Sequence, residues 1–358
     1  MAKFICPYCV SEYNKKQVLH VCQECGITAK PRLFERRVKC RTPGCGGYAN
    51  LRQCPSPECG ETIPRAMLHT PNYLRIAVVG GAISGKNTYT TVVLEELRHD
   101  LNLITVMQDN PTHDWFVENR RSLYEDQLLL GAGFYRPPLN CEIRNLGRGS
   151  RDRGFSLTIN IIPGEYASSF SSHAPRLVQK ADAFIVVIDP LQFPAIRVDN
   201  SVPEDIIRNS LAGTELFYEY HHTINELAHF LREVNGVKPS ALLTKPALAV
   251  VFSKFDTIIN HPALANATAV KKPSYAHANG KLNMADIYNA HSEISGFLEA
   301  VGEGQLLRTL NANFQTYKFF AVSSLGTPPE GPQNIPQIRP HRVLDPVHWL
   351  LKTIGFID

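Results

Sequence analysis

The hydrophobic pattern of the chain predicts an α/β fold from about residue 73 onward. The stretch YLRIAVVG, residues 73–80, alternates large and small apolar residues and ends in glycine, as a strand entering a tight turn does. The next stretch, KNTYTTVVLEELRHDL, places Val92, Val93, Leu97 and Leu101 on one helical stripe. A strand, a glycine-rich loop and a helix are therefore expected in that order.

Further apolar runs follow at the spacing of an α/β domain. Each ends in a polar or glycine-rich turn, and the segments between them are long enough for helices. The runs cover residues 155–165, 181–190, 246–256 and 317–326. We expect a mainly parallel sheet, whose ligands bind beyond the carboxyl ends of the strands. The long segments 100–154 and 257–316 exceed ordinary loops, and we expect extra helices there that carry a partner surface.

The loop after the first strand carries a phosphate-binding signature with one departure. Residues 80–86 fit the pattern G-x-x-x-x-G-K, but Asn87 stands where a serine or threonine would ligate magnesium. Glycines let backbone N–H groups turn toward phosphates, and the following helix adds its positive end. The predicted fold is thus a three-layer P-loop NTPase domain. We assign nucleotide contacts here to Gly80, Gly81, Ser84, Gly85, Lys86, Asn87 and Thr88.

A second motif concerns the base. VVFSKFD delivers Ser253, Lys254 and Asp256 at the end of a strand, and AVSSLG does the same for Ser323 and Ser324. The first resembles the N-K-x-D or T-K-x-D motif of translation factors and small GTPases, and the second resembles their S-A-[KL] motif. By that resemblance, Asp256 accepts hydrogen bonds from guanine, Lys254 covers the base and ribose, and the Ser324 N–H meets the guanine oxygen.

The order of PGE, VVIDP, SSLG and PVHWLL resembles the double-GTPase branch of bacterial GTPases over residues 73–358. That family consists of predicted components of multi-gene conflict or stress systems. The resemblance implies a guanine-nucleotide-dependent switch or scaffold whose partner is a second GTPase encoded nearby. The terminal helix is expected to begin with Asp345 as its cap.

The magnesium ligands of such GTPases are doubtful in this sequence. Asn87 replaces the loop hydroxyl, Ile161 stands at the aspartate position of D-x-x-G, and no threonine occurs from 114 to 157. Because magnesium neutralises charge on the transferring phosphoryl group, we expect GTP binding with weak or no hydrolysis. Three alternatives stay open: an active GTPase that uses Thr88 or Asp189 and in which Glu165 positions a water, an ATPase in which Asp189 ends a Walker B strand, and an adaptor with a vestigial site.

Cysteines set the first part of the chain apart. Eight of nine fall before residue 60, in four close pairs that suit tetrahedral zinc ligation. The predicted ligands are Cys6, Cys9, Cys22, Cys25, Cys40, Cys45, Cys54 and Cys59. Residues 1–66 are therefore expected to form tandem zinc ribbons with two structural zinc ions. The simplest pairing joins the first two pairs and the last two, although interleaved pairing is also possible.

Charge and hydropathy limit the remaining functions. A disulfide framework needs an oxidising compartment, whereas the first residues lack the apolar core of a signal peptide and no run is long enough for a membrane span. A cytoplasmic location is expected. Residues 1–65 hold 11 Lys and Arg against 5 Glu. Each zinc tetrathiolate adds about −2, so protein docking or a structural role is favoured over nucleic-acid binding.

Two weaker candidates remain. Arg144, Arg148, Arg151 and Arg153 can supply an arginine finger to a neighbouring nucleotide, or form a solvated hairpin tip. His222 and His229 share a helical face but have no carboxylate or cysteine in register, so metal binding there is not favoured.

Overall fold

The fold was analysed in a computed structural model. It describes residues 3–32, 35, 37–70, 72–101, 103–131, 137–145, 154–164, 176–198, 201–211, 219–274, 277–278, 281–331 and 334–358. Glu165, Arg148, Arg151 and Arg153 lie outside these residues.

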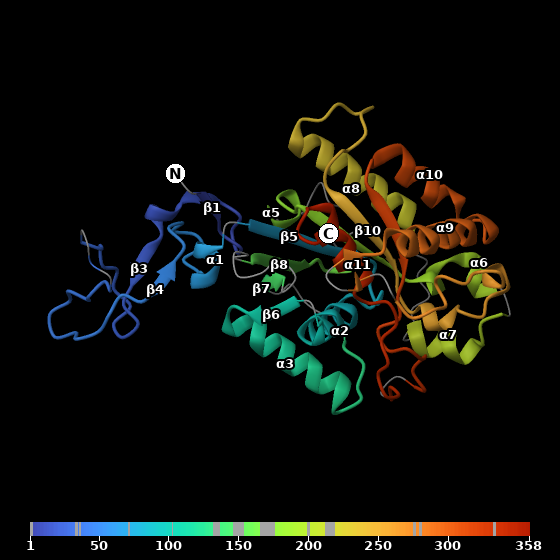
Figure 1. The fold of residues 1–358 in the computed structure, drawn as a ribbon, viewed down its shortest axis with the longest axis horizontal. Helices are drawn as coiled ribbons and strands as arrows, with labels where there is room; N and C mark the ends of the chain where they lie inside the picture. Colours follow the sequence, from blue (N-terminus) through green and yellow to red (C-terminus); the bar gives the residue numbers. More distant parts are fainter. Residues whose placement is uncertain are drawn as a thin grey trace.

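A seven-stranded sheet forms the centre of the molecule (Figure 1). From one edge to the other its strands are β13 (Tyr317–Ala321), β10 (Ala247–Phe252), β9 (Ala183–Ile188), β5 (Asn72–Gly80), β8 (Phe155–Ile161), β7 (Leu139–Asn145) and β6 (Leu103–Met107). The first five are mutually parallel, and β7 pairs antiparallel with both of its neighbours. The carboxyl ends of β5, β9, β10 and β13 therefore meet at one edge of the sheet.

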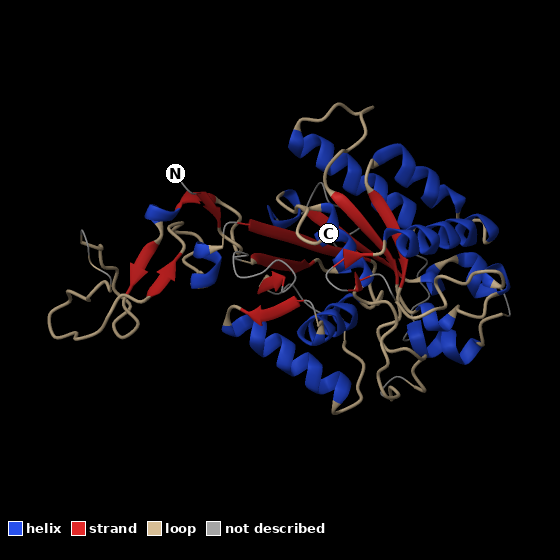
Figure 2. Ribbon diagram, in the orientation of Figure 1, coloured by secondary structure: helices blue, strands red, loops and turns tan. Residues whose placement is uncertain are grey.

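Helices cover both faces of this sheet, as the colouring of Figure 2 makes visible. They are α2 (Lys86–His99), α3 (Asn110–Tyr124), α5 (Arg176–Gln179), α6 (Pro194–Val198), α7 (Glu204–Leu211), α8 (Tyr220–Asn235), α9 (Met284–Ala300), α10 (Gly304–Asn313) and α11 (Asp345–Thr353). Successive side chains of a strand point to opposite faces, so β5 sends Ile76 and Val78 to one core and Ala77 and Val79 to the other. The predicted fold class, a three-layer α/β domain with a mainly parallel sheet after a small cysteine-rich region, is confirmed.

The cysteine-rich region consists of two small antiparallel hairpins and a short helix. β1 (Lys3–Ile5) pairs with β2 (Glu12–Asn14), β3 (Leu19–Val21) pairs with β4 (Leu51–Gln53), and α1 (Arg65–His69) follows. We call residues 19–53 the distal ribbon, and residues 3–18 with 54–70 the proximal ribbon. In Figure 1 the distal ribbon lies at the end of the molecule opposite α6 and α7.

The proximal ribbon contacts the sheet-bearing part of the chain. Phe4, Ile63 and Met67 form a small core against which Tyr73 of β5 packs. The Tyr8 hydroxyl donates to Asp109 Oδ2 at 3.1 Å, and Asp109 also caps α3 by accepting from the backbone N–H of Thr112. A polar contact and an apolar contact therefore fix the junction.

One of the two expectations about the long segments needs correction. Residues 100–154 contain the strands β6 and β7 as well as the helix α3, so the expectation of helices there is only partly right. The segment 257–316 does hold the helices α9 and α10. Two short strands, β11 (His277–Ala278) and β12 (Lys281–Leu282), precede α9. None of the described helices combines the length and the hydropathy needed to cross a bilayer.

Candidate functional site

The cysteines form two clusters with nested pairing. Among the described residues, Cys6, Cys9, Cys54 and Cys59 make one cluster, and Cys22, Cys25, Cys40 and Cys45 make the other. The outer pairs thus enclose the inner ones, and the expectation that the first two pairs would join is wrong. The reason lies in the β3–β4 hairpin, which brings residue 21 opposite residue 51 and so returns the fourth pair to the first.

The sulfur positions fit a tetrahedral zinc ion. The Sγ–Sγ distances are 3.9 Å for Cys6 and Cys59, 3.7 Å for Cys9 and Cys54, 3.7 Å for Cys22 and Cys45, and 3.5 Å for Cys25 and Cys40. Zinc–sulfur bonds of about 2.3 Å in a tetrahedron place the sulfurs about 3.8 Å apart. A disulfide requires about 2.05 Å, so these distances suit metal ligation and not oxidation.

The path of the backbone in the loop after β5 requires glycine at two points, where a Cβ would clash with neighbouring backbone atoms. A Cβ on Gly80 would lie 2.3 Å from the Val187 carbonyl oxygen of the neighbouring strand, and one on Gly164 would lie 2.5 Å from the Ala82 nitrogen. Gly85 has a φ of 85° and immediately precedes α2. The loop therefore turns sharply from β5 into the N-terminus of α2, while Gly164 lies directly against it.

Three side chains of the loop and the start of α2 have different neighbours. Lys86 Nζ donates to the carbonyls of Gly80 (2.9 Å) and Gly81 (2.7 Å), which holds the buried ammonium over the loop. Ser84 is fully buried, and its hydroxyl has no partner among the described residues. Asn87 Nδ2 approaches the Gly131 carbonyl at 3.4 Å, so its amide faces the segment that follows α3.

The base motif is tied to the phosphate loop through Ser253. Its hydroxyl lies 2.8 Å from the Ser84 carbonyl oxygen and 3.0 Å from that of Ile188. The next residue, Lys254, has a φ of 50°, and its Nζ lies 2.6 Å from Asp189 Oδ2. Asp189 is fully buried and accepts the backbone N–H of Leu191 with its other oxygen. Both carboxylate oxygens of Asp189 therefore have protein partners, Lys254 for one and the backbone N–H of Leu191 for the other.

Asp256 stands at the carboxyl end of β10, next to Ser323 of the neighbouring strand end. Burial raises the pKa of the Asp256 carboxyl above its ordinary value, and a hydrogen bond with the Ser323 side chain opposes that rise. The Ser323 hydroxyl also accepts the Gly326 N–H at 2.7 Å, which fixes its position. A partly desolvated carboxylate held by a serine is well placed to accept N–H groups from a ligand.

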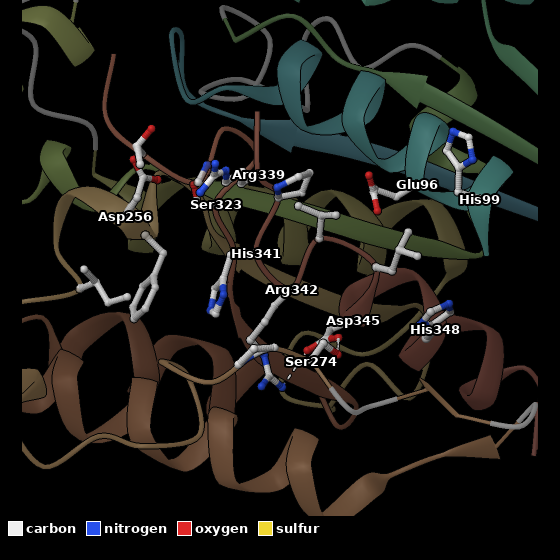
Figure 3. A pocket seen from close by; sticks show the side chains of 18 of the residues that line it. Glu96, His99, Asp256, Ser274, Ser323, Arg339, His341, Arg342, Asp345 and His348 are labelled. Carbon is white, nitrogen blue, oxygen red and sulfur yellow. Dashed lines mark hydrogen bonds and ion pairs between the residues drawn. The ribbon is translucent and has the colours of Figure 1, made fainter. Parts of the chain in front are cut away.

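Two spaces meet at Asp256. A narrow cleft of about 70 Å³ leads toward the phosphate loop and is lined by Gly85, Thr88, Leu129, Ser253, Lys254, Asp256, Thr257, Ser324, Leu325 and Pro329. A cavity of about 700 Å³ extends from Asp256 to the end of α2 and the start of α11 (Figure 3). Small-molecule sites usually occupy roughly 300–1,000 Å³, so the larger space is of ligand size and the narrow one is not.

The wall of the larger cavity contains an ionic cluster that sequence reasoning missed. Arg342 pairs with Asp286 at 2.6 Å and with Asp345 at 2.7 Å, and Ser274 is hydrogen-bonded to Asp345. Asp345 is therefore not the cap of α11: Leu344 holds that position, while the Asp345 carboxylate is buried against Arg342. His341 stacks on Phe255 with the ring centroids 6.3 Å apart. The charged and histidine residues that lie close together in residues 339–348 could have indicated this cluster from the sequence.

The residues considered for a magnesium site have different surroundings in the structure. Ile161 ends β8 with an apolar side chain that packs against the core, and Asp189 is paired with Lys254. Thr88 lines the narrow cleft beside Asp256. The other weak candidates gain no support, because within the described ranges only the two cysteine clusters gather potential metal ligands, and Arg144 pairs with Glu142 at 2.9 Å.

No protein-family model matches the chain, and no curated protein matches it. Solved structures similar to it include the Ski7 GTPase-like domain of S. cerevisiae bound to GDP and inorganic phosphate, at 14% identity and a TM-score of 0.33 over 80% of this chain and 51% of that one. The same domain bound to GTP matches at 16% identity and a TM-score of 0.30, over 71% of this chain and 43% of that one. Sup35 complexed with GDP matches at 15% identity and a TM-score of 0.27, over 71% and 37%.

The chain thus spans about half or less of the length of these structures. Because all three TM-scores are low, the similarity establishes no function for this chain.

Proposed function

We propose that this protein is a guanine-nucleotide-binding switch or scaffold with weak or no GTP hydrolysis. The observation that carries the proposal is the position of Asp256 beside Ser323, at the ends of adjacent parallel strands and in one cleft with Gly85 and Thr88. Ligands of parallel sheets bind at this edge. A phosphate group at the loop and a base at Asp256 would occupy the two ends of one ligand.

Base selectivity follows from the chemistry of the carboxylate. Guanine presents a ring N–H and an exocyclic amine side by side, and a carboxylate can accept from both, whereas adenine presents no such pair. Hydrogen bonds to charged groups contribute about 1.5–3 kcal/mol each, so two of them separate GTP from ATP by at least about a hundredfold. The larger cavity on the far side of Asp256 leaves room for the base.

Weak hydrolysis follows from the poor fit of magnesium. Magnesium prefers oxygen ligands in octahedral geometry and stabilises charge on a transferring phosphoryl group. Asn87 turns toward Gly131, Ile161 offers no oxygen, and Asp189 is engaged by Lys254. The pairing of Asp189 also disfavours the ATPase alternative, since a Walker B aspartate must face the metal.

The cellular role is part of the proposal and comes from the sequence resemblance. The two cysteine clusters would hold structural zinc ions, which a reducing cytosol permits by keeping thiolates available. The partner would be a second GTPase or another protein of the same bacterial conflict or stress system. The switch would then act through its partner and not through turnover.

Calorimetric titration with GTP, GDP and ATP tests nucleotide binding, with magnesium present and then omitted. Omission is preferable to a chelator, which would strip zinc. We expect GTP and GDP to bind, ATP to bind at least about a hundredfold more weakly, and magnesium to change little. Equal binding of ATP would refute the base assignment, strong magnesium dependence with turnover would show an active GTPase, and no binding would leave the adaptor alternative.

Exchange of the carboxylate for an amide sharpens this test. Asp256→Asn should weaken GTP binding at least about tenfold and strengthen XTP binding, because xanthine carries a carbonyl where guanine carries the amine. Asp205→Asn, at an exposed position of helix α7, is the matched control and should change neither affinity. Unchanged preference in Asp256→Asn would contradict the role of this residue.

A further inference from the structure

Nested pairing concentrates positive charge on the distal ribbon. The distal ribbon, residues 19–53, contains seven Lys and Arg against two Glu, whereas the proximal ribbon contains four against three. A zinc tetrathiolate contributes about −2 to each, which leaves the distal ribbon clearly positive and the proximal ribbon slightly negative. When the charge is averaged over the whole cysteine-rich region, this separation is lost.

The two acidic side chains of the distal ribbon have neighbours within the ribbon itself. Glu35 accepts the backbone N–H groups of Arg32 at 2.8 Å and Lys39 at 3.0 Å, and these bonds lower the pKa of its carboxyl. Glu35 also pairs with Arg41 at 3.3 Å, and the exposed Glu24 lies 3.8 Å from Cys45 Sγ. By contrast, the side chains of Lys30, Arg32, Arg37, Lys39 and Arg41 are exposed. Glu35 is therefore engaged by backbone N–H groups and by Arg41, whereas five cations of the ribbon are exposed to solvent.

An aromatic ring stands beside these cations. Tyr48 is 42% exposed and pairs with Lys39 in an antiparallel bridge, which places the two side chains on the same side. Ile27, 49% exposed, lies on the neighbouring knuckle, where its carbonyl accepts the Cys22 N–H at 2.9 Å. The Gln23 N–H bonds the Tyr48 carbonyl at 3.4 Å, so the two knuckles are joined.

From this arrangement we infer that the distal ribbon binds single-stranded nucleic acid. Arg37 and Lys39 would contact phosphates, Arg41 would exchange its surface ion pair with Glu35 for a phosphate contact, and Tyr48 would stack on a base. An exposed ring next to exposed cations is the combination that sequence-tolerant binders of single strands use. A base face is free for stacking only when the base is unpaired, so duplex is not the expected ligand. This site lies at the end of the molecule remote from the nucleotide cleft (Figure 1) and does not depend on the proposed function.

Fluorescence anisotropy of the zinc-loaded full chain, without added nucleotide, tests the inference. The probes are labelled 12-nucleotide oligo(U) and oligo(dT) and a duplex of the same length. Three phosphate contacts predict a logarithmic salt slope of about −2, so affinity for single strands should fall about twentyfold between about 50 and 200 mM salt. Equal affinity for oligo(U) and oligo(dT) would mean that the site recognises features common to RNA and DNA. Tighter binding of oligo(U) would identify RNA as the ligand.

The variants separate stacking from charge. Tyr48→Ala should weaken binding at least about fivefold, Tyr48→Phe should restore it, and Lys39→Ala should make the salt slope shallower by about 0.7. Matched controls are Lys16→Ala on the proximal ribbon and Tyr288→Ala, an exposed tyrosine of α9, which should change nothing. Each variant is checked for a zinc content of two per chain, so loss of binding cannot be loss of the fold.

Several results would overturn the inference. These are absence of binding at low salt, binding of duplex as tight as that of single strands, and indifference to Tyr48→Ala. Competition by polyglutamate without a contribution from Tyr48 would indicate an acidic protein as the partner instead.

Discussion

Glycine at position 164 shows how little space remains beside the loop that follows β5. A Cβ there would lie 2.5 Å from the nitrogen and 2.8 Å from the Cα of Ala82, and backbone atoms cannot yield as a flexible side chain can. The residue belongs to the PGE segment, which resembles the end of a GTPase switch. Gly164 therefore packs directly against the backbone of the loop that follows β5, and a change at Gly164 should displace that loop.

Gly164→Ala should therefore displace the loop. We expect at least tenfold weaker GDP binding by calorimetry and a loss of about 1–3 kcal/mol in the free energy of unfolding, as overpacking costs. Gly296→Ala in α9 is the control, since a Cβ there meets nothing within 4 Å. It should stabilise the helix by about 0.5–1 kcal/mol. Unchanged GDP affinity in Gly164→Ala would separate the segment from the site.

Individual residues differ in how far the sequence predicted them. Lys86, Ser253 and Asp256 follow strands whose apolar pattern is unambiguous, so their meeting at one sheet edge follows from the parallel topology. The partner of Asp189 was not predictable, because the side chain of Lys254 can point toward ligand or protein and only packing decides. Arg342 was missed for the same reason: its partners Asp286 and Asp345 become neighbours only when α9 and α11 dock.

Among the elements, the edge strand β13 depends on a histidine. The Phe319 N–H of β13 donates to His291 Nδ1 of α9 at 3.1 Å, and the two rings stack with centroids 5.3 Å apart. Burial lowers the pKa of His291 to about 4, and Lys318 contributes to the same shift. The neutral ring is thus the form that accepts this hydrogen bond.

Acid should loosen this connection between α9 and the sheet. Because the pKa of His291 is lower in the folded chain than its ordinary value of 6.5, the unfolded chain takes up the proton first, and stability falls as pH drops from about 6.5 to about 4. His291→Gln keeps an acceptor that does not titrate, so urea unfolding at several pH values should show a shallower decline. The exposed His222→Gln is the control. An identical decline in His291→Gln would exclude this histidine as a cause.

The strands β6 and β7 were missed although their pattern was present. LITVM and LNCEIRN have β-branched or alternating apolar residues, as strands do. The length of the surrounding segment suggested helices instead. Both strands extend the sheet in the antiparallel sense. A short alternating run does not by itself distinguish a strand from part of a helical segment when the strand that pairs with it is unknown.

For the whole molecule, the apolar cores of the sheet-bearing part contain none of the eight clustered cysteines. The proximal ribbon has its own small core around Phe4 and Met67. Small metal domains obtain most of their folding free energy from the ion. The two parts should therefore differ in their response to zinc removal.

Treatment with a zinc chelator should unfold residues 3–70 and leave the seven-stranded sheet folded. Hydrogen exchange followed by mass spectrometry checks this: peptides of β1–β4 should lose protection, while those of β5, β9 and β10 should keep it. Re-addition of zinc should restore protection and serves as the control. Simultaneous loss of protection in both parts would show that the Tyr8–Asp109 junction makes them one cooperative unit.

The β3–β4 hairpin also determines how the distal ribbon can be exchanged. Val21 lies opposite Leu51 and Leu19 opposite Gln53, so the chain enters and leaves this ribbon at adjacent points. A tight turn that joined Val21 directly to Leu51 would remove the 29 residues between them and leave the proximal ribbon intact. The four cysteines of its cluster all lie outside those 29 residues. The distal ribbon is thus an insertion in the proximal ribbon. Its surface can be lengthened, shortened or replaced without moving the outer cysteine cluster or the sheet-bearing part of the chain.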